Sequence, residues 1–248
     1  MRNRVRSAIL AGLTTLAFSP GLLAQTAGQP GAAKATAAAS TPDLSGVWNQ
    51  RGRISFFASP VMTPWGVEKY KGVRIGITDP GEQGLDYLDP VQACYPTAPA
   101  RHLTLNRPFE IIQLPDRVLL LYEFQHERRV IYTDGREHPK GLKPAWMGHS
   151  VGRWDKDTLV VDAIGFREET WLDGLGHPHS EAMRYVERFR RVAQDTLEIE
   201  FTFNDPEAYT KPWGGKRVFQ LRPDWQILEH VNCEDYLMER LQNLTKTR

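Results

Sequence analysis

The chain has 248 residues, and its 31 basic and 30 acidic side chains leave a formal net charge of +1. Because the basic residues are interspersed with acidic ones, no surface for nucleic acids or anionic membranes is predicted. The sequence also lacks phosphate-binding glycine loops, a dinucleotide-binding fingerprint, haem attachment motifs and paired zinc cysteines, which disfavours nucleotide and haem cofactors.

The N-terminus is typical of a secretory signal peptide. A basic segment at 2–6 is followed by an apolar stretch at 8–18 and by a cleavage position near Ala24, with Ala27 as the alternative. The apolar stretch is too short to span a bilayer comfortably. We therefore expect a periplasmic or secreted protein with no integral membrane association.

The next segment, residues 25–41, is rich in Ala, Gly, Thr, Ser and Pro and carries a single charge. Such a composition has too little apolar bulk to offset the entropy lost on ordering, so it predicts a flexible leader. The remaining residues, 42–248, suit one β domain with one core. The predicted organisation is a signal peptide at 1–24, a leader at 25–41 and a single barrel domain at 42–248.

Two cysteines, Cys94 and Cys233, lie near opposite ends of the predicted domain. Because the export signal directs the chain to an oxidising compartment, a disulfide between them is the first interpretation. Two buried thiols are the alternative.

Short apolar or alternating segments, separated by turn residues such as Pro115-Asp116 and Asp134-Gly135, follow along the chain. We expect strands at 109–114, 117–124, 128–133, 148–154, 158–162, 182–192, 196–203, 217–221 and 226–231. Helical periodicity is confined to 63–71 and 235–244. Repeated hairpins without βαβ spacing predict a mostly β fold with one or two short helices, either a closed antiparallel barrel or a sandwich.

The predicted domain opens on Leu44-Ser45-Gly46-Val47-Trp48. This Gly-x-Trp resembles the first strand of lipocalins and other calycin-type barrels, where the Trp closes one end of the barrel. The resemblance implies an up-and-down, lipocalin-like barrel, whereas a Trp that merely anchors a first strand is the alternative. The segment 108–213, with GHSVGRW, DTLVVD and GHPHSE, also resembles a group of exported bacterial proteins, which implies a secreted barrel and no particular reaction.

Gly148-His149-Ser150-Val151-Gly152 matches the G-x-S-x-G nucleophile elbow of α/β-hydrolases. That elbow requires a helix directly after the serine, because the tight turn exposes the hydroxyl and aims helix amides at the oxyanion. Residues 153–157 form a hairpin turn instead. The two glycines are better explained by a curved strand that another group approaches closely.

His177 and His179 lie in the densest polar segment and are two residues apart. In an extended segment both imidazoles point to one side, an arrangement that zinc sites often use. A third ligand would come from His149, Asp162, Glu187 or His230. A hydrogen-bonded, pH-sensitive loop is the alternative.

A proton-transfer group is predicted from His149, Asp162, His179 and Glu187. Alternation places Glu187 inside the barrel, and Val160 shares a face with Asp162, so both carboxylates are expected to be buried. Burial raises the pKa of a carboxyl group and suits it to acid–base catalysis. Structural ion pairs with Arg184, Arg188 or Arg190 are the alternative.

Aromatic and polar side chains around the same segments predict a ligand-binding lining, because large rings with a polar edge suit apolar or aromatic ligands. The predicted ligand-binding residues are Trp154, Trp171, Tyr185, Tyr209, Lys211 and Trp213. An ordinary β core explains many of the rings equally well.

Together these patterns predict a secreted barrel that binds a hydrophobic or aromatic small molecule in its cavity. We expect cofactor-free acid–base catalysis on that molecule, as in a lyase, isomerase or hydratase. A non-catalytic ligand-binding or carrier protein is the first alternative. A metal-dependent hydrolase, which would use His177 and His179 to hold a divalent metal such as zinc, is the second, and a serine hydrolase is the least favoured.

Overall fold

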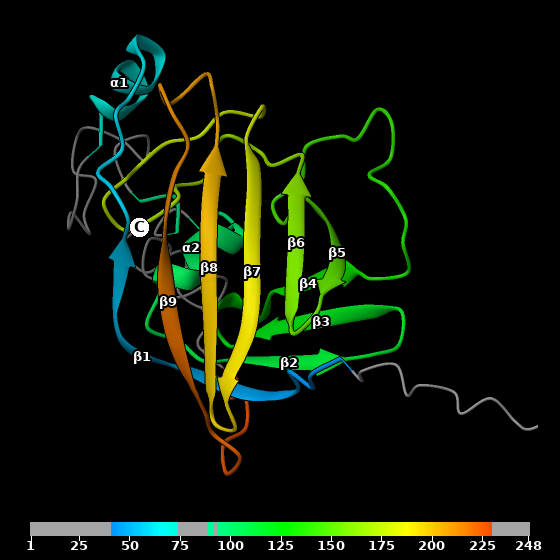
Figure 1. Cartoon of the computed structure of the whole chain (residues 1–248). Coiled ribbons are helices and arrows are strands. Elements are labelled where there is room, and N and C mark those ends of the chain that lie inside the picture. Colours follow the sequence, from blue (N-terminus) through cyan, green and yellow to red (C-terminus); the bar gives the residue numbers. More distant parts are fainter. Residues whose placement is uncertain (1–40, 74–88, 92–93, 230–248) are drawn as a thin grey trace, which may run out of the picture. The chain divides into compact units, whose positions relative to one another are not determined.

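The computed structural model describes residues 41–73, 89–91 and 94–229, and these segments form nine strands and two α-helices (Figure 1). The strands are β1 (Gly46–Phe56), β2 (Phe109–Gln113), β3 (Arg117–Tyr122), β4 (Arg128–Tyr132), β5 (His149–Asp155), β6 (Thr158–Ile164), β7 (Arg184–Ala193), β8 (Thr196–Asn204) and β9 (Trp213–Leu221). The helices are α1 (Pro64–Tyr70) and α2 (Pro99–Thr104), and a 3-10 turn, η3, spans Phe124–His126.

The strands close in chain order into one barrel, because β9 pairs back with β1. This arrangement confirms the expected mostly β, lipocalin-like barrel and excludes the sandwich. One departure from the up-and-down pattern is the parallel pair of β4 and β5, in which Ile131 lies opposite Ser150. The long connection 133–148 returns the chain to the same end of the barrel, as a parallel pair requires.

Most of the expected elements are present within two or three residues of their predicted bounds. Helix α1 begins after Thr63, whose hydroxyl accepts a hydrogen bond from the backbone N–H of Gly66. The strand expected at 226–231 was wrong for its described part, since 226–229 contains no strand. The late helix at 235–244, the signal peptide, the leader and Cys233 lie outside the described residues, so they and the Cys94–Cys233 disulfide stay predictions.

Side-chain alternation determines which residues fill the barrel. On β8, Leu197, Ile199, Phe201 and Phe203 are all buried on the inner face. Trp48 on β1 is fully buried and donates a hydrogen bond from Nε1 to the Leu44 carbonyl oxygen at 2.8 Å. The inner faces therefore form one continuous hydrophobic core.

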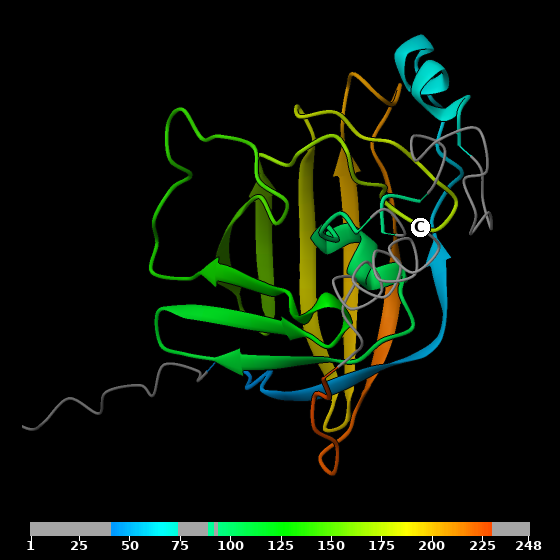
Figure 2. The same ribbon diagram turned by 180° about the vertical axis from the view of Figure 1, so that it is seen from behind.

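Helix α2, which was not predicted, lies on the concave side of strands β7 to β9 (Figures 1 and 2). Its Ala100 and Leu103 belong to the hydrophobic core, and the Leu103 carbonyl oxygen accepts a hydrogen bond from Arg217 on β9. Its buried His102 and Arg101 bring polar groups into the same region. No helix in the described ranges is long and apolar enough to cross a membrane.

Strand β1 carries an irregularity that opens the barrel wall. Its pairing with β9 shifts between Arg51 and Ser55, so residues 52–54 stand opposite the single residue Arg217. Gly52 lies at φ +73°, a left-handed conformation that glycine adopts without strain. The pairing of β1 with β2 ends at Trp48 and Phe109. Beyond Trp48, β1 therefore pairs with β9 and no longer with β2.

Candidate functional site

The four predicted catalytic side chains do not converge. Glu187 lies inside the barrel and is 1 % exposed, whereas Asp162 and His149 lie on the outer face of β6 and β5. His179 is buried in the loop between β6 and β7. The inward placement of Asp162 was wrong because Val160, which suggested it, is an apolar residue on the outer face that is nevertheless buried.

His149 and Asp162 are connected through a residue that the sequence analysis missed. Nδ1 of His138 lies 2.8 Å from Nδ1 of His149, and its Nε2 lies 3.4 Å from the Asp162 carboxylate. Arg184 donates two hydrogen bonds to Asp162 at 2.7 and 2.6 Å. Partial burial, with the charges of His138 and Arg136, lowers the pKa of His149. This group is a surface ion pair with a histidine pair beside it, as the structural alternative predicted for Arg184.

Glu187 pairs with Arg129, a second residue without a sequence signal. Their closest nitrogen and oxygen atoms lie 2.5 Å apart, and each side chain is 1 % exposed. Burial disfavours the charge of Arg129, but Glu187 more than offsets it and raises the pKa of the guanidinium. Within the described residues, Nη1 of Arg129 and the Tyr185 hydroxyl have no hydrogen-bond partner. The charge of the pair is thus balanced internally.

Ser150 lies in the middle of this interior group and not on a nucleophile elbow. It belongs to β5, is 2 % exposed, and its hydroxyl accepts a hydrogen bond from Nε of Arg129 at 3.0 Å. Strand β5 turns directly into β6, with no helix immediately after the serine, so the serine hydrolase hypothesis lacks its geometry. The flanking glycines permit close approach: a Cβ on Gly152 would lie 2.8 Å from the Ile131 side chain.

A buried acid and a buried base meet beside α2. Nε2 of His102 lies 2.5 Å from the Glu127 carboxyl group, and the His102 ring stacks on Tyr122 with 3.7 Å between centroids. Burial raises the pKa of Glu127 to about 8. Burial, with the charges of Arg129 and Arg101, lowers the pKa of His102 to about 3. Near neutral pH the pair therefore holds one proton and no net charge.

His177 and His179 engage separate partners. Nδ1 of His177 lies 2.6 Å from the Asp173 carboxylate, whereas Nε2 of His179 lies 2.7 Å from the Thr170 hydroxyl. Burial lowers the pKa of His179. No group of three His, Cys, Asp or Glu side chains that could hold a metal ion occurs among the described residues, and the candidate ligand His230 lies outside them. The arrangement matches the alternative of a hydrogen-bonded loop.

The predicted ligand-binding residues divide by burial. Tyr185, Tyr209 and Trp213 are at most 4 % exposed and belong to the core, where Phe203 stacks on Tyr185 at 5.1 Å and contacts Trp213 at 4.8 Å. The other three are the half-buried Trp154 and Trp171 and the exposed Lys211. None of the six lines either of the two pockets described below.

The opening beside the β1 bulge forms a pocket of about 660 Å³. We call it the β1 pocket; it is lined by Gln50, Gly52, Arg53, Ile54, Thr104, Asn106 and Arg217. Arg217 is 6 % exposed, and burial lowers its pKa to about 10. Nε of Arg217 and Oε1 of Gln50 are buried without a hydrogen-bond partner among the described residues. The lining contains two guanidinium groups and no carboxylate, so it favours an anion.

No protein-family profile and no curated protein matches this chain. The functional assignment therefore depends on the geometry of the described residues alone.

Proposed function

We propose that the protein is an exported barrel that binds a small organic anion with an apolar or aromatic body at the β1 pocket. The observation that carries the proposal is Arg217, a buried guanidinium whose Nε is unpartnered among the described residues and whose charge no lining carboxylate balances. The proposal retains the predicted small-molecule binding and moves it from the barrel centre to the opening between β1 and α2.

The electrostatics of the pocket support an anionic ligand. A buried guanidinium without a counter-ion is unfavourable, and the lowered pKa of Arg217 reflects this burial. A carboxylate in the pocket would supply the counter-charge and accept a charge-assisted hydrogen bond from Nε. Arg53, which is exposed at the mouth, adds a second positive charge on the approach to the pocket.

The surroundings of Arg217 support an apolar body on the same ligand. Ile54 packs against the hydrophobic core, and the Phe219 ring centroid lies 5.9 Å from the guanidinium carbon of Arg217. A volume of about 660 Å³ suits a small organic molecule. The β1 bulge creates this volume directly opposite Arg217, and bulges often re-aim a strand next to a binding site.

Calorimetric titration with benzoate, phenylacetate and octanoate, each paired with its neutral amide, tests the proposal. We expect at least one carboxylate to bind about tenfold more tightly than its amide, equivalent to about 1.4 kcal/mol. Arg217→Met, which retains the apolar stem, should abolish this preference. Arg51→Gln removes an exposed charge from β1, outside the pocket, and should leave the preference unchanged. Equal binding of acid and amide, or unchanged binding by Arg217→Met, contradicts the proposal.

A second candidate function is cofactor-free acid–base catalysis on the bound anion, as in a lyase, isomerase or hydratase. It is favoured by the His102–Glu127 pair, because His102 directly precedes the residue whose carbonyl oxygen binds Arg217. A carboxyl group with a pKa of about 8 can donate and accept a proton near neutral pH. Exchange of the α-hydrogens of phenylacetate in D2O, followed by NMR, should occur with the wild-type protein and stop in Glu127→Gln. Absence of exchange with a ligand that binds contradicts this candidate alone.

A further inference from the structure

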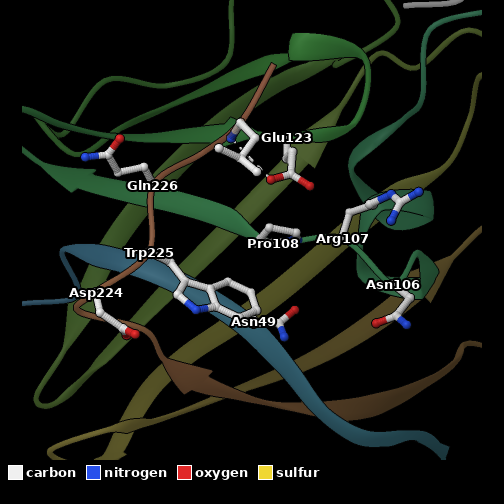
Figure 3. A pocket seen from close by; sticks show the side chains of 9 residues that line it. Asn49, Asn106, Arg107, Pro108, Glu123, Asp224, Trp225 and Gln226 are labelled. Atoms are coloured by element: carbon white, nitrogen blue, oxygen red, sulfur yellow. Dashed lines mark hydrogen bonds between the residues drawn. The ribbon is translucent and has the colours of Figure 1, made fainter. Parts of the chain in front are cut away.

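The outer side of β1 carries a second hollow, of about 640 Å³ (Figure 3). We call it the Trp225 groove; it is lined by Asn49, Asn106, Arg107, Pro108, Glu123, Asp224, Trp225, Gln226 and Leu228. Asn49 and Gln50 are successive residues of β1, and Asn106 lines both hollows, so the groove and the β1 pocket are neighbours with otherwise different linings.

Trp225 is the unusual residue of this groove. It is 40 % exposed, whereas the other six tryptophans of the chain are half-buried or buried. Tryptophan is highly buried on average in folded proteins, so an exposed indole at the wall of a groove is informative. Figure 3 shows its ring next to Asn49.

The Trp225 residue is also held in place. Its backbone N–H donates to the Arg222 carbonyl oxygen at 3.1 Å, and the Arg222 guanidinium lies 4.8 Å from the ring centroid. The following chain is fixed by a hydrogen bond from the Leu228 N–H to the Glu123 carboxylate at 3.3 Å. A ring whose position is set before binding loses little entropy when a ligand stacks on it.

The polar lining of the groove contains both hydrogen-bond donors and hydrogen-bond acceptors. The amides of Asn49, Asn106 and Gln226 each donate and accept, Glu123 and Asp224 accept, and Arg107 donates. A sugar hydroxyl is both donor and acceptor, and the C–H face of a pyranose ring is apolar and flat. We propose that the Trp225 groove binds a neutral saccharide, with one pyranose ring on Trp225 and its hydroxyls on the surrounding amides and carboxylates.

Other ligand classes fit this lining less well. The carboxylates of Glu123 and Asp224 repel phosphate groups, which disfavours a nucleic acid. An extended peptide bound by its side chains needs successive apolar pockets, whereas Pro108, Trp225 and Leu228 are the apolar members of the lining.

The test is a neutral-glycan array probed with the full mature protein, followed by titration of the best mono- or oligosaccharide using tryptophan fluorescence. Trp225→Ala should weaken binding at least about tenfold, and Asn49→Ala should weaken it less. Trp225→Phe, which keeps an aromatic face, should recover most of the affinity. Phe57→Ala removes another exposed aromatic ring, 58 % accessible and outside the groove, and should change nothing.

Two outcomes overturn the proposal: no glycan bound at millimolar concentration, or equal binding by folded Trp225→Ala. The circular dichroism spectrum of each variant verifies that it is folded. Because the saccharide proposal does not depend on the anion site, Arg217→Met should bind the same glycan normally. Loss of anion binding with retained glycan binding therefore separates the two proposals.

Discussion

Two arginines lie inside the same barrel, and their surroundings have opposite effects on them. Arg129 is 1 % exposed and pairs with Glu187, which raises the pKa of its guanidinium despite burial. Arg217 is 6 % exposed and donates to a carbonyl oxygen, and burial lowers its pKa to about 10. The first charge is balanced by the fold. The second has no carboxylate partner among the described residues, and this difference separates a structural ion pair from the binding group that we propose.

Removal of the Glu187 charge should lower the free energy of unfolding more than any other change predicted below. Glu187→Gln leaves Arg129 buried without a counter-charge, so we expect the free energy of unfolding to fall by about 3–5 kcal/mol. Urea denaturation at pH 7, followed by circular dichroism, measures this change. Replacing both partners, as in Arg129→Met with Glu187→Leu, should recover most of the loss, because apolar residues of similar size remove both charges together.

A matched exposed pair provides the control. Glu198 and Lys216 lie 3.0 Å apart on the outer face of β8 and β9, with side chains 23 % and 39 % exposed. Glu198→Gln should change the unfolding free energy by less than about 1 kcal/mol. If Glu187→Gln had no larger effect than Glu198→Gln, the interior pair would not be the balanced charge described above.

The next largest effect is a pH dependence of stability that arises from Glu127 and His102, where His102 also senses the charge of Arg129. The folded pair releases protons with pKa values of about 3 and 8, whereas the unfolded values are 6.5 for His102 and 4.5 for Glu127. Between pH 6.5 and 8 the folded state therefore binds more protons than the unfolded state, and stability falls as pH rises. Below pH 4.5 the unfolded state binds more, and stability falls as pH decreases.

We expect the free energy of unfolding to be roughly 2 kcal/mol lower at pH 8 than at pH 6. Glu127→Gln, which cannot titrate, should flatten this decline. Urea denaturation at half-unit pH intervals is the measurement. A decline that persists unchanged in Glu127→Gln would show that other groups cause it.

The fold was largely predictable because each strand carries local information. Alternation on β8 and turn residues such as Asp134-Gly135 depend on neighbours in the chain, so they identify strands without tertiary structure. Two features of the fold were not predicted, because they depend on contacts between residues that are distant in the sequence. Helix α2 has six residues and is stabilised by burial against the core, and the β4–β5 pair is parallel only because of where a long loop returns the chain.

The sites were less predictable for the same reason. Glu187 was correctly placed inside, but its partner Arg129 lies on β4, far away in the sequence. Val160 falsely suggested that Asp162 points inward. Arg217 gave no signal because a single charge in an alternating strand is ordinary. Its significance arises from the bulge in β1, which a sequence indicates only weakly through Gly52.

The smallest change in the free energy of unfolding should come from a substitution of Arg217. Arg217→Met removes one hydrogen bond to the Leu103 carbonyl oxygen, which contributes about 1 kcal/mol, and also removes a buried charge that no carboxylate of the pocket lining balances. Because the two changes oppose each other, we expect the unfolding free energy in urea to shift by no more than about 1 kcal/mol in either direction. A loss as large as that of Glu187→Gln would mean that the fold depends on Arg217. A small shift, with lost carboxylate binding, would mean that this arginine is maintained for its ligand, since a group that contributes little to stability gains its advantage from what it binds.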